Sequence, residues 1–309
     1  MSVFPSKHFS LHPLTENVVA AIASDSGAAV SNAGLVKLGG QLVVFDTFMT
    51  PQASLELSRA AQELFGCAPT LVVNSHYHND HIWGNQIFAD SAHIISTIHT
   101  RELIATAGKE EFDYYSANAA QRLESIRAEY HKADERQRAE LSFWIAYYEG
   151  LVEALPTLQV VMPDLTFDSH MEIHAGGRKA ELLAFDGAHT GNDAILYLPQ
   201  DGIVFMSDLL FVGCHPYLAD GDALKLLSAL KEIEKLEATH FIPGHGSVGT
   251  RDDLALMIAY VERCLQIAQE IRQSGKTSQE RIAALEIPEP FQDWRFTKFF
   301  QMNMQFLCQ

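Results

Sequence analysis

Four side chains of metal-binding type occur within six residues of this sequence, in the segment HYHNDH at 76–81. In an extended loop, side chains two residues apart point the same way, so His76 and His78 can converge on one metal ion. Asp80 and His81 follow where the loop is expected to enter a helix, and they can face a second ion. The spacing differs from the i, i+4 pair of a helical HExxH zinc site, which excludes that type of site here.

Three further candidate ligands follow apolar runs of strand length elsewhere in the chain. They are His189 in AFDGAHTGND, Asp208 in VFMSDLL and His245 in FIPGHGSVG. We expect each to stand at a turn-like position after its strand, with glycines beside the two histidines. A catalytic zinc ion needs three protein ligands plus water. Seven candidate groups therefore fit two ions with one bridging carboxylate.

Such a site predicts hydrolysis by an activated water. Two divalent cations roughly 3.5–4 Å apart hold a bridging water and lower its pKa toward ~7. The resulting hydroxide would attack an electrophilic carbon or phosphorus, while a metal ion stabilises the charge that develops on the substrate oxygen. No serine or cysteine nucleophile is then required. Asp80 and Asp208 are the candidates for catalytic roles. Asp80 could orient the hydroxide, although it is also a candidate metal ligand and that role already occupies its carboxylate.

These motifs and their order resemble the metallo-β-lactamase-fold hydrolase superfamily. The match consists of HxHxDH at 76–81, the histidine of AHTGND, the aspartate of SDLL and the histidine of PGHG, and it covers about residues 18–249. The resemblance implies an α/β fold, a four-layer αββα metallo-β-lactamase sandwich with the metals at one edge between two β-sheets. It also implies that one metal is held by His76, His78 and His189, the second by Asp80, His81 and His245, and that Asp208 bridges them.

Short strands and helices alternate in both halves of the chain, as in an α/β protein. Apolar runs in the first half predict strands over 18–23, 41–46, 70–73 and 92–95. Pro51 opens a helix whose apolar residues recur at helical spacing and whose stop is Gly66. The second half predicts strands over 159–163, 165–168, 194–198, 203–207 and 240–243, a hairpin over 171–185 that turns at Gly176-Gly177, and a helix over 223–236.

Two regions are expected to add helices to the sandwich, an insertion at about 100–156 and a C-terminal region at about 251–309. The insertion lacks proline until Pro156 and predicts two or three helices. Its aromatic residues have two interpretations, a lid over the active site or a core (or dimer contact) of the insertion itself, and we favour the second. They are Phe112, Tyr114, Tyr115, Phe143, Trp144, Tyr147 and Tyr148.

Composition restricts the class of protein and its partners. The 309 residues include 22 basic and 39 acidic side chains, a net charge of −17, which argues against a nucleic-acid partner because such binding needs a dense basic face. The four cysteines lie far apart, which suits a reducing compartment. No apolar run approaches the ~20 residues that span a bilayer, and the N-terminus lacks a signal-peptide pattern. We expect one cytoplasmic domain over 1–309 that acts on a small molecule, binds no membrane or nucleic acid, and is compatible with a homodimer.

Three functional hypotheses follow, in order of preference. The first is a dinuclear hydrolase of an ester, thioester or lactone; a β-lactam amide or a phosphoester is the alternative substrate. It would bind two divalent ions, for which zinc is preferred and iron or manganese is the alternative. Zinc β-lactamases with a cysteine ligand are disfavoured, because Asp208 stands where they have the cysteine. The second is an iron-dependent oxidoreductase on the same fold, since histidine and carboxylate ligands accept iron as readily as zinc. The third is a non-catalytic metal-binding or interaction protein.

Two residues that follow Asp208 in FVGCHPYLADGD are candidates for substrate contact. They are His215 and Tyr217, which should lie near the metals because they are close in sequence, with loop packing as the alternative. Asp193, four residues beyond His189, is expected to be a structural carboxylate rather than a ligand.

Overall fold

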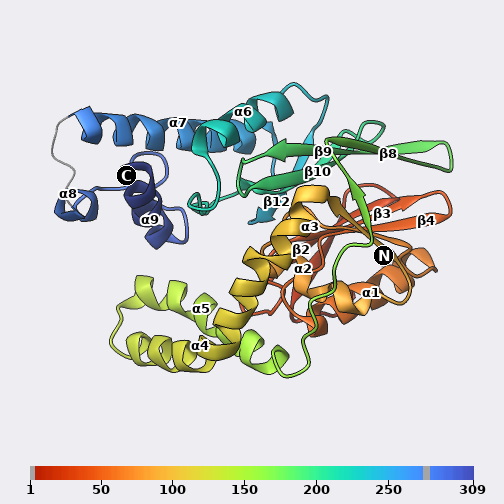
Figure 1. Ribbon diagram of the computed structural model, residues 1–309, viewed down its shortest axis with the longest axis horizontal. Coiled ribbons are helices and arrows are strands. Elements are labelled where there is room, and N and C mark those ends of the chain that lie inside the picture. Colours follow the sequence, from red (N-terminus) through yellow and green to blue (C-terminus); the bar gives the residue numbers. More distant parts are fainter. Residues whose placement is uncertain (1–3, 274–278) are drawn as a thin grey trace.

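Two β-sheets packed face to face form the centre of the molecule, and helices cover their outer faces (Figure 1). This computed structural model describes residues 4–273 and 279–309. Helix α1 (Pro51–Phe65) covers the first sheet, and α6 (Ala223–Ile233) and α7 (Arg251–Gln273) cover the second. The layer order of helix, sheet, sheet and helix confirms the predicted α/β sandwich.

The first sheet has seven strands, which lie side by side in their chain order. The first four pair antiparallel, whereas β4 to β7 pair in parallel and need crossover connections between them. Helix α1 supplies the first crossover, and the insertion supplies the last. The strands are β1 (Phe9–Pro13), β2 (Val18–Ala23), β3 (Ala33–Leu38), β4 (Gln41–Phe45), β5 (Leu71–Val73), β6 (His93–Thr97) and β7 (Leu165–Phe167).

The second sheet has five strands in the order β12-β11-β10-β9-β8. They are β8 (His170–Ala175), β9 (Arg178–Asp186), β10 (Asn192–Leu198), β11 (Ile203–Phe211) and β12 (His240–His245). The predicted hairpin is confirmed as β8 and β9, and both turn residues, Gly176 and Gly177, have positive φ. Strands β11 and β12 pair in parallel, with α6 in the connection between them.

Alternating side chains bury both faces of the first sheet. On β4, Val43 and Phe45 pack into the core between the sheets, whereas Leu42 and Val44 pack toward α1. A strand alternates its side chains with a period of two, so this continuous apolar run is what a sheet covered on both faces requires. The inter-sheet core also needs a close approach at Gly34 of β3, where a Cβ would overlap the ring of Phe205.

Helix α1 begins and ends where the sequence predicts. The Thr50 side chain accepts a hydrogen bond from the backbone N–H of Ala53, and Pro51 occupies the first turn. Gly66 ends the helix in the left-handed conformation, with φ of 70°. This helix fixes the connection between β4 and β5, and the chain leaves β5 directly into the histidine-rich segment.

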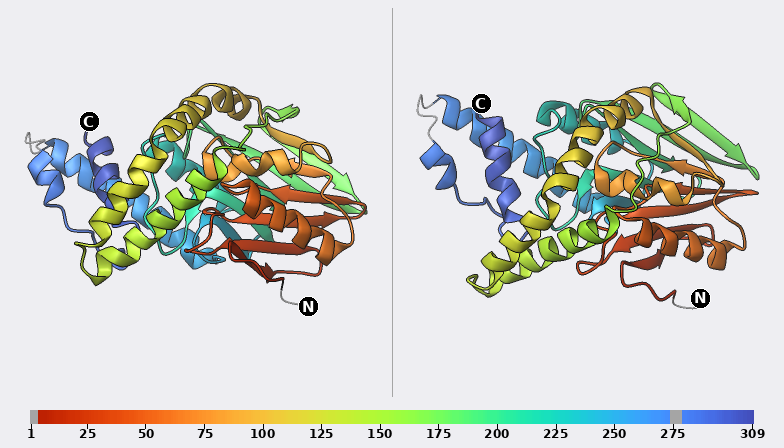
Figure 2. Two further views of the ribbon diagram at one scale, coloured as in Figure 1. Left: turned by 90° about the horizontal axis from the view of Figure 1, so that it is seen from below. Right: turned by 60° about the horizontal axis from the view of Figure 1, so that its bottom comes forward.

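The insertion and the C-terminal region project from the same end of the sandwich (Figure 2). The insertion consists of α3 (Ile98–Ala105), α4 (Ala107–Tyr130) and α5 (Glu135–Ala154), which confirms the predicted helices. The C-terminal region consists of α7, α8 (Gln279–Ala283) and α9 (Thr297–Leu307), and the predicted helical stretch includes residues 274–278, which lie outside the described ones. Among the described residues, no helix is both long and apolar enough to span a bilayer.

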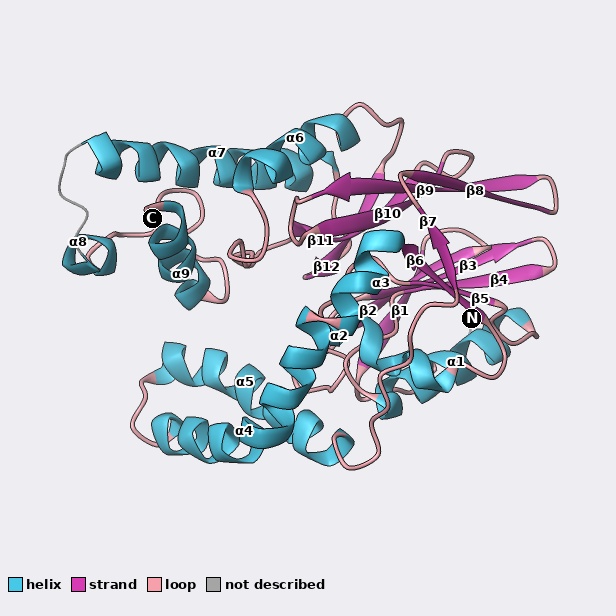
Figure 3. Cartoon of the chain, viewed as in Figure 1, coloured by secondary structure: helices cyan, strands magenta, loops and turns pink. Residues whose placement is uncertain are grey.

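Two differences from the predicted elements have physical reasons. Residues 159–163 form a loop rather than a strand (Figure 3). Side chains donate hydrogen bonds to backbone carbonyl groups that would otherwise pair with a neighbouring strand: Asn85 donates to the carbonyl of Val161, and Arg101 donates to that of Pro163. Strands β1 and β3 are missing from the prediction. On β3, Gly34 interrupts the apolar pattern, and the structure needs glycine there to admit Phe205.

Candidate metal centre

The seven side chains predicted as metal ligands come together where the two sheets meet. The β5–α2 loop carries His76 and His78, and the short helix α2 (Asn79–Ile82) carries Asp80 and His81. The β9–β10 turn, β11 and the end of β12 carry the other three, His189, Asp208 and His245. Since both sheets contribute, the cluster forms only when the sandwich has assembled.

Asp208 lies inside β11, which corrects the prediction that it follows the strand. The strand continues to Phe211, and its pairing with β12 shifts register on both sides of Ser207. Ser207 has φ of 48°, in the left-handed region. Such irregularities re-aim a side chain out of the regular ladder. Here the irregularity lies directly beside the aspartate that meets the ligands of the other sheet.

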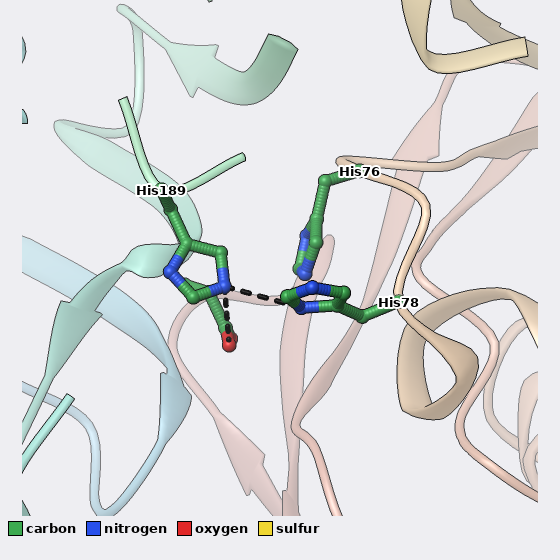
Figure 4. Close-up of side chains that lie close together, drawn as sticks. His76, His78 and His189 are labelled. Atoms are coloured by element: carbon green, nitrogen blue, oxygen red, sulfur yellow. Dashed lines mark hydrogen bonds and ion pairs between the residues drawn. The ribbon is translucent and has the colours of Figure 1, made fainter. Parts of the chain in front are cut away.

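The first group of candidate ligands comprises three histidines and one aspartate. Figure 4 shows the rings of His76, His78 and His189 directed toward one another. Together with Asp208, they place one ligating atom each within 4.8 Å of all the others. Nδ1 of His78 lies only 3.2 Å from Nε2 of His189.

The second group comprises Asp80, His81 and His245, whose ligating atoms also lie within 4.8 Å of one another. Asp208 contacts both groups. Its Oδ1 lies 3.2 Å from Nε2 of His81, and its Oδ2 lies 3.4 Å from Nε2 of His245 and 3.3 Å from Nε2 of His189. A carboxylate in this position can serve two cations at once.

Hydrogen bonds on the outer side of the rings leave lone pairs directed into the cluster. Nδ1 of His76 bonds to Ser75 Oγ at 2.9 Å, and Nδ1 of His81 lies 2.8 Å from Asp46 Oδ2. Nε2 of both rings is buried: that of His76 finds no hydrogen-bond partner among the described residues, and that of His81 faces Asp208 Oδ1 at 3.2 Å. Leaving a buried polar atom unpaired costs about 1–3 kcal/mol, and a metal ion would remove that cost. The donor set therefore fits divalent cations.

Asp46 holds the second group from beneath. Its carboxylate accepts the backbone N–H of Ser75 at 2.8 Å, the hydroxyls of Ser75 and Ser207 at 2.8 and 2.9 Å, and the ring N–H of His81. A carboxylate behind a ligating histidine fixes its tautomer and orientation. The sequence-based prediction did not include this role of Asp46. The one signal for it is that an acidic residue directly follows a buried strand, β4.

Burial and neighbouring charge shift the pKa values of the histidines. Burial lowers the pKa of His76 well below its ordinary value and lowers that of His189 to about 3. Both rings are therefore neutral and able to ligate at neutral pH. Burial acts the same way on His81, but surrounding carboxylates, Asp80 foremost, outweigh it and raise its pKa. The cluster thus concentrates negative charge that a cation would neutralise.

Asp220 orients the first group in the way that Asp46 orients the second. Its Oδ2 lies 3.0 Å from Nε2 of His78 and accepts the hydroxyl of Tyr77 at 3.2 Å. With Nε2 as the donor to Asp220, Nδ1 of the His78 ring is the nitrogen that faces His189. No local sequence signal distinguishes Asp220 from other loop aspartates.

Two other residues shape the backbone around the ligands. Asp193 accepts the backbone N–H groups of His189 and Thr190 at 2.9–3.1 Å, which agrees with its predicted structural role. Gly244, beside His245, lies so close to Asp208 that a Cβ there would overlap the carboxylate. The glycine of the PGHG motif thus makes room for the carboxylate between the two groups.

A cavity of about 550 Å³ opens onto the ligands. Tyr217 lies on its wall, so substrate contact stays a prediction for this residue. His215 is fully buried away from it and packs against Tyr260 and Trp294, which favours the packing alternative. Five of the insertion's aromatic residues line the cavity and also pack on one another, so both interpretations of them apply in part. They are Tyr115, Phe143, Trp144, Tyr147 and Tyr148.

Glu111 is a carboxylate on the cavity wall that sequence analysis missed. It comes from α4, accepts the backbone N–H of Asn79, and has one oxygen that is buried without a partner among the described residues. Burial raises its pKa to about 7. It joins the insertion to the ligand-bearing helix α2.

Comparisons with solved structures support the fold. A metallo-beta-lactamase from Pontibacter korlensis has a TM-score of 0.60 at 17% sequence identity, and the likeness covers 82% of this chain and 99% of that one. The stereoselective inverting sec-alkylsulfatase Pisa1 from Pseudomonas sp. has a TM-score of 0.69 at 18% identity, and the likeness covers 97% of this chain and 50% of that one. A search of curated proteins gives no significant match.

The family comparison agrees with the geometry. A model of the metallo-beta-lactamase superfamily matches residues 26–245, which is more than half of the chain. This range includes all seven side chains of the cluster, and the cluster's donor set fits a metal-dependent hydrolase. The chain therefore belongs to the metallo-beta-lactamase superfamily.

Proposed function

We propose that this protein is a dinuclear metal-dependent hydrolase that cleaves an ester, thioester or lactone of a small molecule. The observation that carries the proposal is the convergence of imidazole nitrogens around the buried Asp208, whose carboxylate lies within 3.2–3.4 Å of histidines from both groups. A single ion would leave one group of donors unused. Two ions would use all seven.

In this proposal each group holds one ion and Asp208 serves both. The assignment is His76, His78 and His189 for the first ion and Asp80, His81 and His245 for the second. Two divalent ions, preferably zinc, would supply an activated water and polarise the substrate oxygen. A histidine and carboxylate set also accepts manganese or iron.

The chain's own residues orient the ligands and limit access to them. Asp46 and Asp220 hold the rings of His81 and His78 in the orientation that directs their lone pairs inward. Phe211 stacks on the ring of His245, with centroids 5.1 Å apart and an interplanar angle of 21°. Phe211 also lines the cavity, so its ring places an apolar surface beside His245.

Hydrolysis of an alkyl sulfate is the second candidate reaction. Its support is the structural likeness to the sec-alkylsulfatase, which extends over 97% of this chain and so includes the helical insertion and the C-terminal helices. Iron-dependent oxidation is a third candidate, because the same ligands accept iron and the bound metal would then decide the reaction. The net charge of −17 supports a small-molecule substrate rather than a nucleic acid.

The proposal is tested by metal analysis followed by a substrate panel. Protein purified without added metal is analysed by elemental mass spectrometry, and about two zinc or manganese ions per chain are expected. The panel then compares esters, lactones, thioesters, phosphoesters and alkyl sulfates, with a chelator-treated sample as the control. Turnover of a carboxylic ester or lactone that is lost with chelator and restored by metal supports the proposal.

Three outcomes would contradict it. Iron with oxygen consumption would favour the oxidoreductase, and turnover confined to sulfates would favour the sulfatase. Two bound ions with no turnover of any ester, lactone or thioester would leave the hydrolase proposal without support.

A further inference from the structure

The cavity in front of the metal centre has walls from two segments that lie far apart in the sequence. Helix α5 of the insertion contributes Phe143, Trp144 and Tyr147, and the α9 region contributes Phe296, Phe299 and Met302. The segments touch each other: ring centroids are 4.7 Å apart for Phe143 and Phe296 and 6.0 Å apart for Trp144 and Phe299. Contact between the insertion and the C-terminal region thus forms part of the cavity wall.

An apolar surface runs from this contact to the ligands. The ring of Phe299 lies 5.6 Å from that of Tyr217, which follows β11, and Phe211 of the same strand stacks on His245. Trp144 and Phe299 are only half-buried, although both are large apolar side chains. Covering such surface with an apolar ligand is favourable by roughly 25 cal/mol per Å².

Charged side chains on the cavity wall are mainly acidic. Among the described lining residues, the cations are Arg122 and Lys298, and the acids outside the proposed ligand set are Glu111, Glu129, Glu140 and Asp220. Arg122 already hydrogen-bonds to tyrosine hydroxyls, those of Tyr114 and Tyr148. A substrate tail that carries several negative charges would therefore meet more repulsion than attraction.

From these observations we propose that the substrate is an uncharged ester or lactone with an apolar group of about six or more carbons. The apolar group lies against Trp144 of α5 and Phe299 of α9 on the cavity wall, and these two side chains determine specificity. A cavity of about 550 Å³ falls within the range of sites for drug-sized ligands. The inference rests on the proposed hydrolase function and narrows it, because it excludes thioesters of polyanionic carriers.

The first experiment compares three p-nitrophenyl esters on the metal-loaded protein: acetate, hexanoate and the half-ester of adipic acid. Hexanoate should exceed acetate in kcat/KM by at least about tenfold, since each buried methylene contributes up to ~0.8 kcal/mol. The adipate half-ester has a similar length but a charged end, and it should lose most of that gain. Equal values for hexanoate and adipate would overturn the charge argument.

The second experiment assigns the preference to the two side chains. Trp144→Ala and Phe299→Ala should each lower the ratio of hexanoate to acetate kcat/KM by about fivefold or more, because each removes one wall of the apolar site. The ratio is insensitive to loss of active protein, since unfolding lowers both values equally. Phe65→Ala is the matched control. Phe65 is a half-buried aromatic residue of α1 that packs on the core between α1 and the first sheet, so its loss should leave the ratio unchanged.

A binding measurement separates this inference from the hydrolase proposal. Hexanohydroxamate and acetohydroxamate share a metal-binding head and differ in the tail, so calorimetric Kd values report the apolar site without turnover. A Kd at least about tenfold lower for the hexanoyl compound supports the inference even if no ester is cleaved. Equal Kd values, or an unchanged preference in Trp144→Ala and Phe299→Ala, would overturn it whether or not the protein is a hydrolase.

Discussion

The metal centre and the cavity above it are built in different ways. At the centre, polar side chains are held by short hydrogen bonds to one another and to the backbone, as the four bonds accepted by Asp46 illustrate. In the cavity, aromatic rings from α5 and α9 pack edge to face, and the contact between Trp144 and Phe299 joins segments about 150 residues apart in sequence. The first arrangement fixes direction, and the second provides shape.

This difference assigns chemistry and specificity to separate parts of the chain. The likeness to the Pontibacter metallo-beta-lactamase covers 82% of this chain and nearly all of that one, whereas the likeness to the sulfatase covers 97% of this chain. Both likenesses support the sandwich fold that carries the metal centre. Changes in the sandwich should affect metal and rate together, and changes in the helices should affect substrate choice alone.

Asp208→Ala is the variant expected to affect the centre most. It removes the carboxylate that lies within 3.2–3.4 Å of His81, His189 and His245, so both groups lose a ligand. We expect metal content to fall by about one ion or more per chain and turnover to fall by at least about a thousandfold, since residues that act as a unit fail together. Elemental mass spectrometry and kcat on the best panel substrate measure the two effects.

The matched control for this variant is Asp168→Ala, an exposed aspartate in the connection between β7 and β8. Metal content and turnover should stay unchanged in it. Near-normal turnover in Asp208→Ala would contradict the role of this residue between the two groups.

Asp46→Asn tests the hydrogen bonds beneath the centre. The amide has one acceptor oxygen in place of two, so it cannot accept from Ser75, Ser207 and the His81 ring together. We expect metal affinity to fall about 10–100-fold and the free energy of unfolding of the metal-free protein to fall by about 1–3 kcal/mol. Chelator competition and urea unfolding measure these changes.

A control with the same chemistry lies at another strand end. Asp164 also accepts a backbone N–H, from Ile94, and a histidine N–H, from His93, but it lies far from the ligands. Asp164→Asn should leave metal affinity unchanged. Equal metal affinities in the Asp46 and Asp164 variants would refute the orienting role of Asp46.

Asp220→Asn should have a smaller effect on the first group. Its side chain is 35% exposed, and the amide oxygen can still accept the N–H of His78, although without a negative charge. We expect about tenfold weaker metal binding, at the low end for a residue behind a ligand. Asp222→Asn, two residues along the same loop, is the control: Asp222 caps α6, where asparagine caps equally well. A similar affinity in both variants would argue against the positioning role of Asp220.

The sequence predicts the ligands much better than the residues that support them. His76, His78, Asp80 and His81 occur in one short segment, and the other candidate ligands lie within or directly after recognisable strands, so local pattern suffices. Asp46 acquires its role through side chains that are distant in sequence: Ser75 and His81, 29 and 35 residues away, and Ser207 of the other sheet, 161 residues away. Composition gives no sign of such a contact.

The same limit applies to His215, which follows β11. Sequence proximity to Asp208 suggested that His215 lies near the metals, but β11 continues to Phe211 and the chain then turns toward the C-terminal region. The backbone N–H of His215 donates to Arg295 at 2.9 Å, which draws the ring into the aromatic core. A partner 80 residues away, rather than the neighbours in sequence, decides where this side chain lies.

A buried histidine outside the centre provides the smallest and most local test. His8, before β1, is 4% exposed, and its Nδ1 accepts the backbone N–H of Ala28 at 3.0 Å. Burial lowers its pKa, and the nearby Glu56 offsets this only in part. Unlike the rings of the metal centre, His8 is held by a backbone donor that requires Nδ1 to be unprotonated.

His8→Asn should therefore change the pH dependence of stability rather than metal binding. Because the folded-state pKa is lowered, the unfolded state binds more protons below about pH 6.5, and wild-type stability falls as pH decreases through that range. Asparagine keeps an acceptor oxygen that does not titrate, so the variant should lack this part of the decrease, about 1 kcal/mol between pH 7 and pH 5. Urea unfolding of both metal-free proteins across this range measures the difference, and parallel stability curves would show that the Ala28 contact does not depend on the protonation of His8.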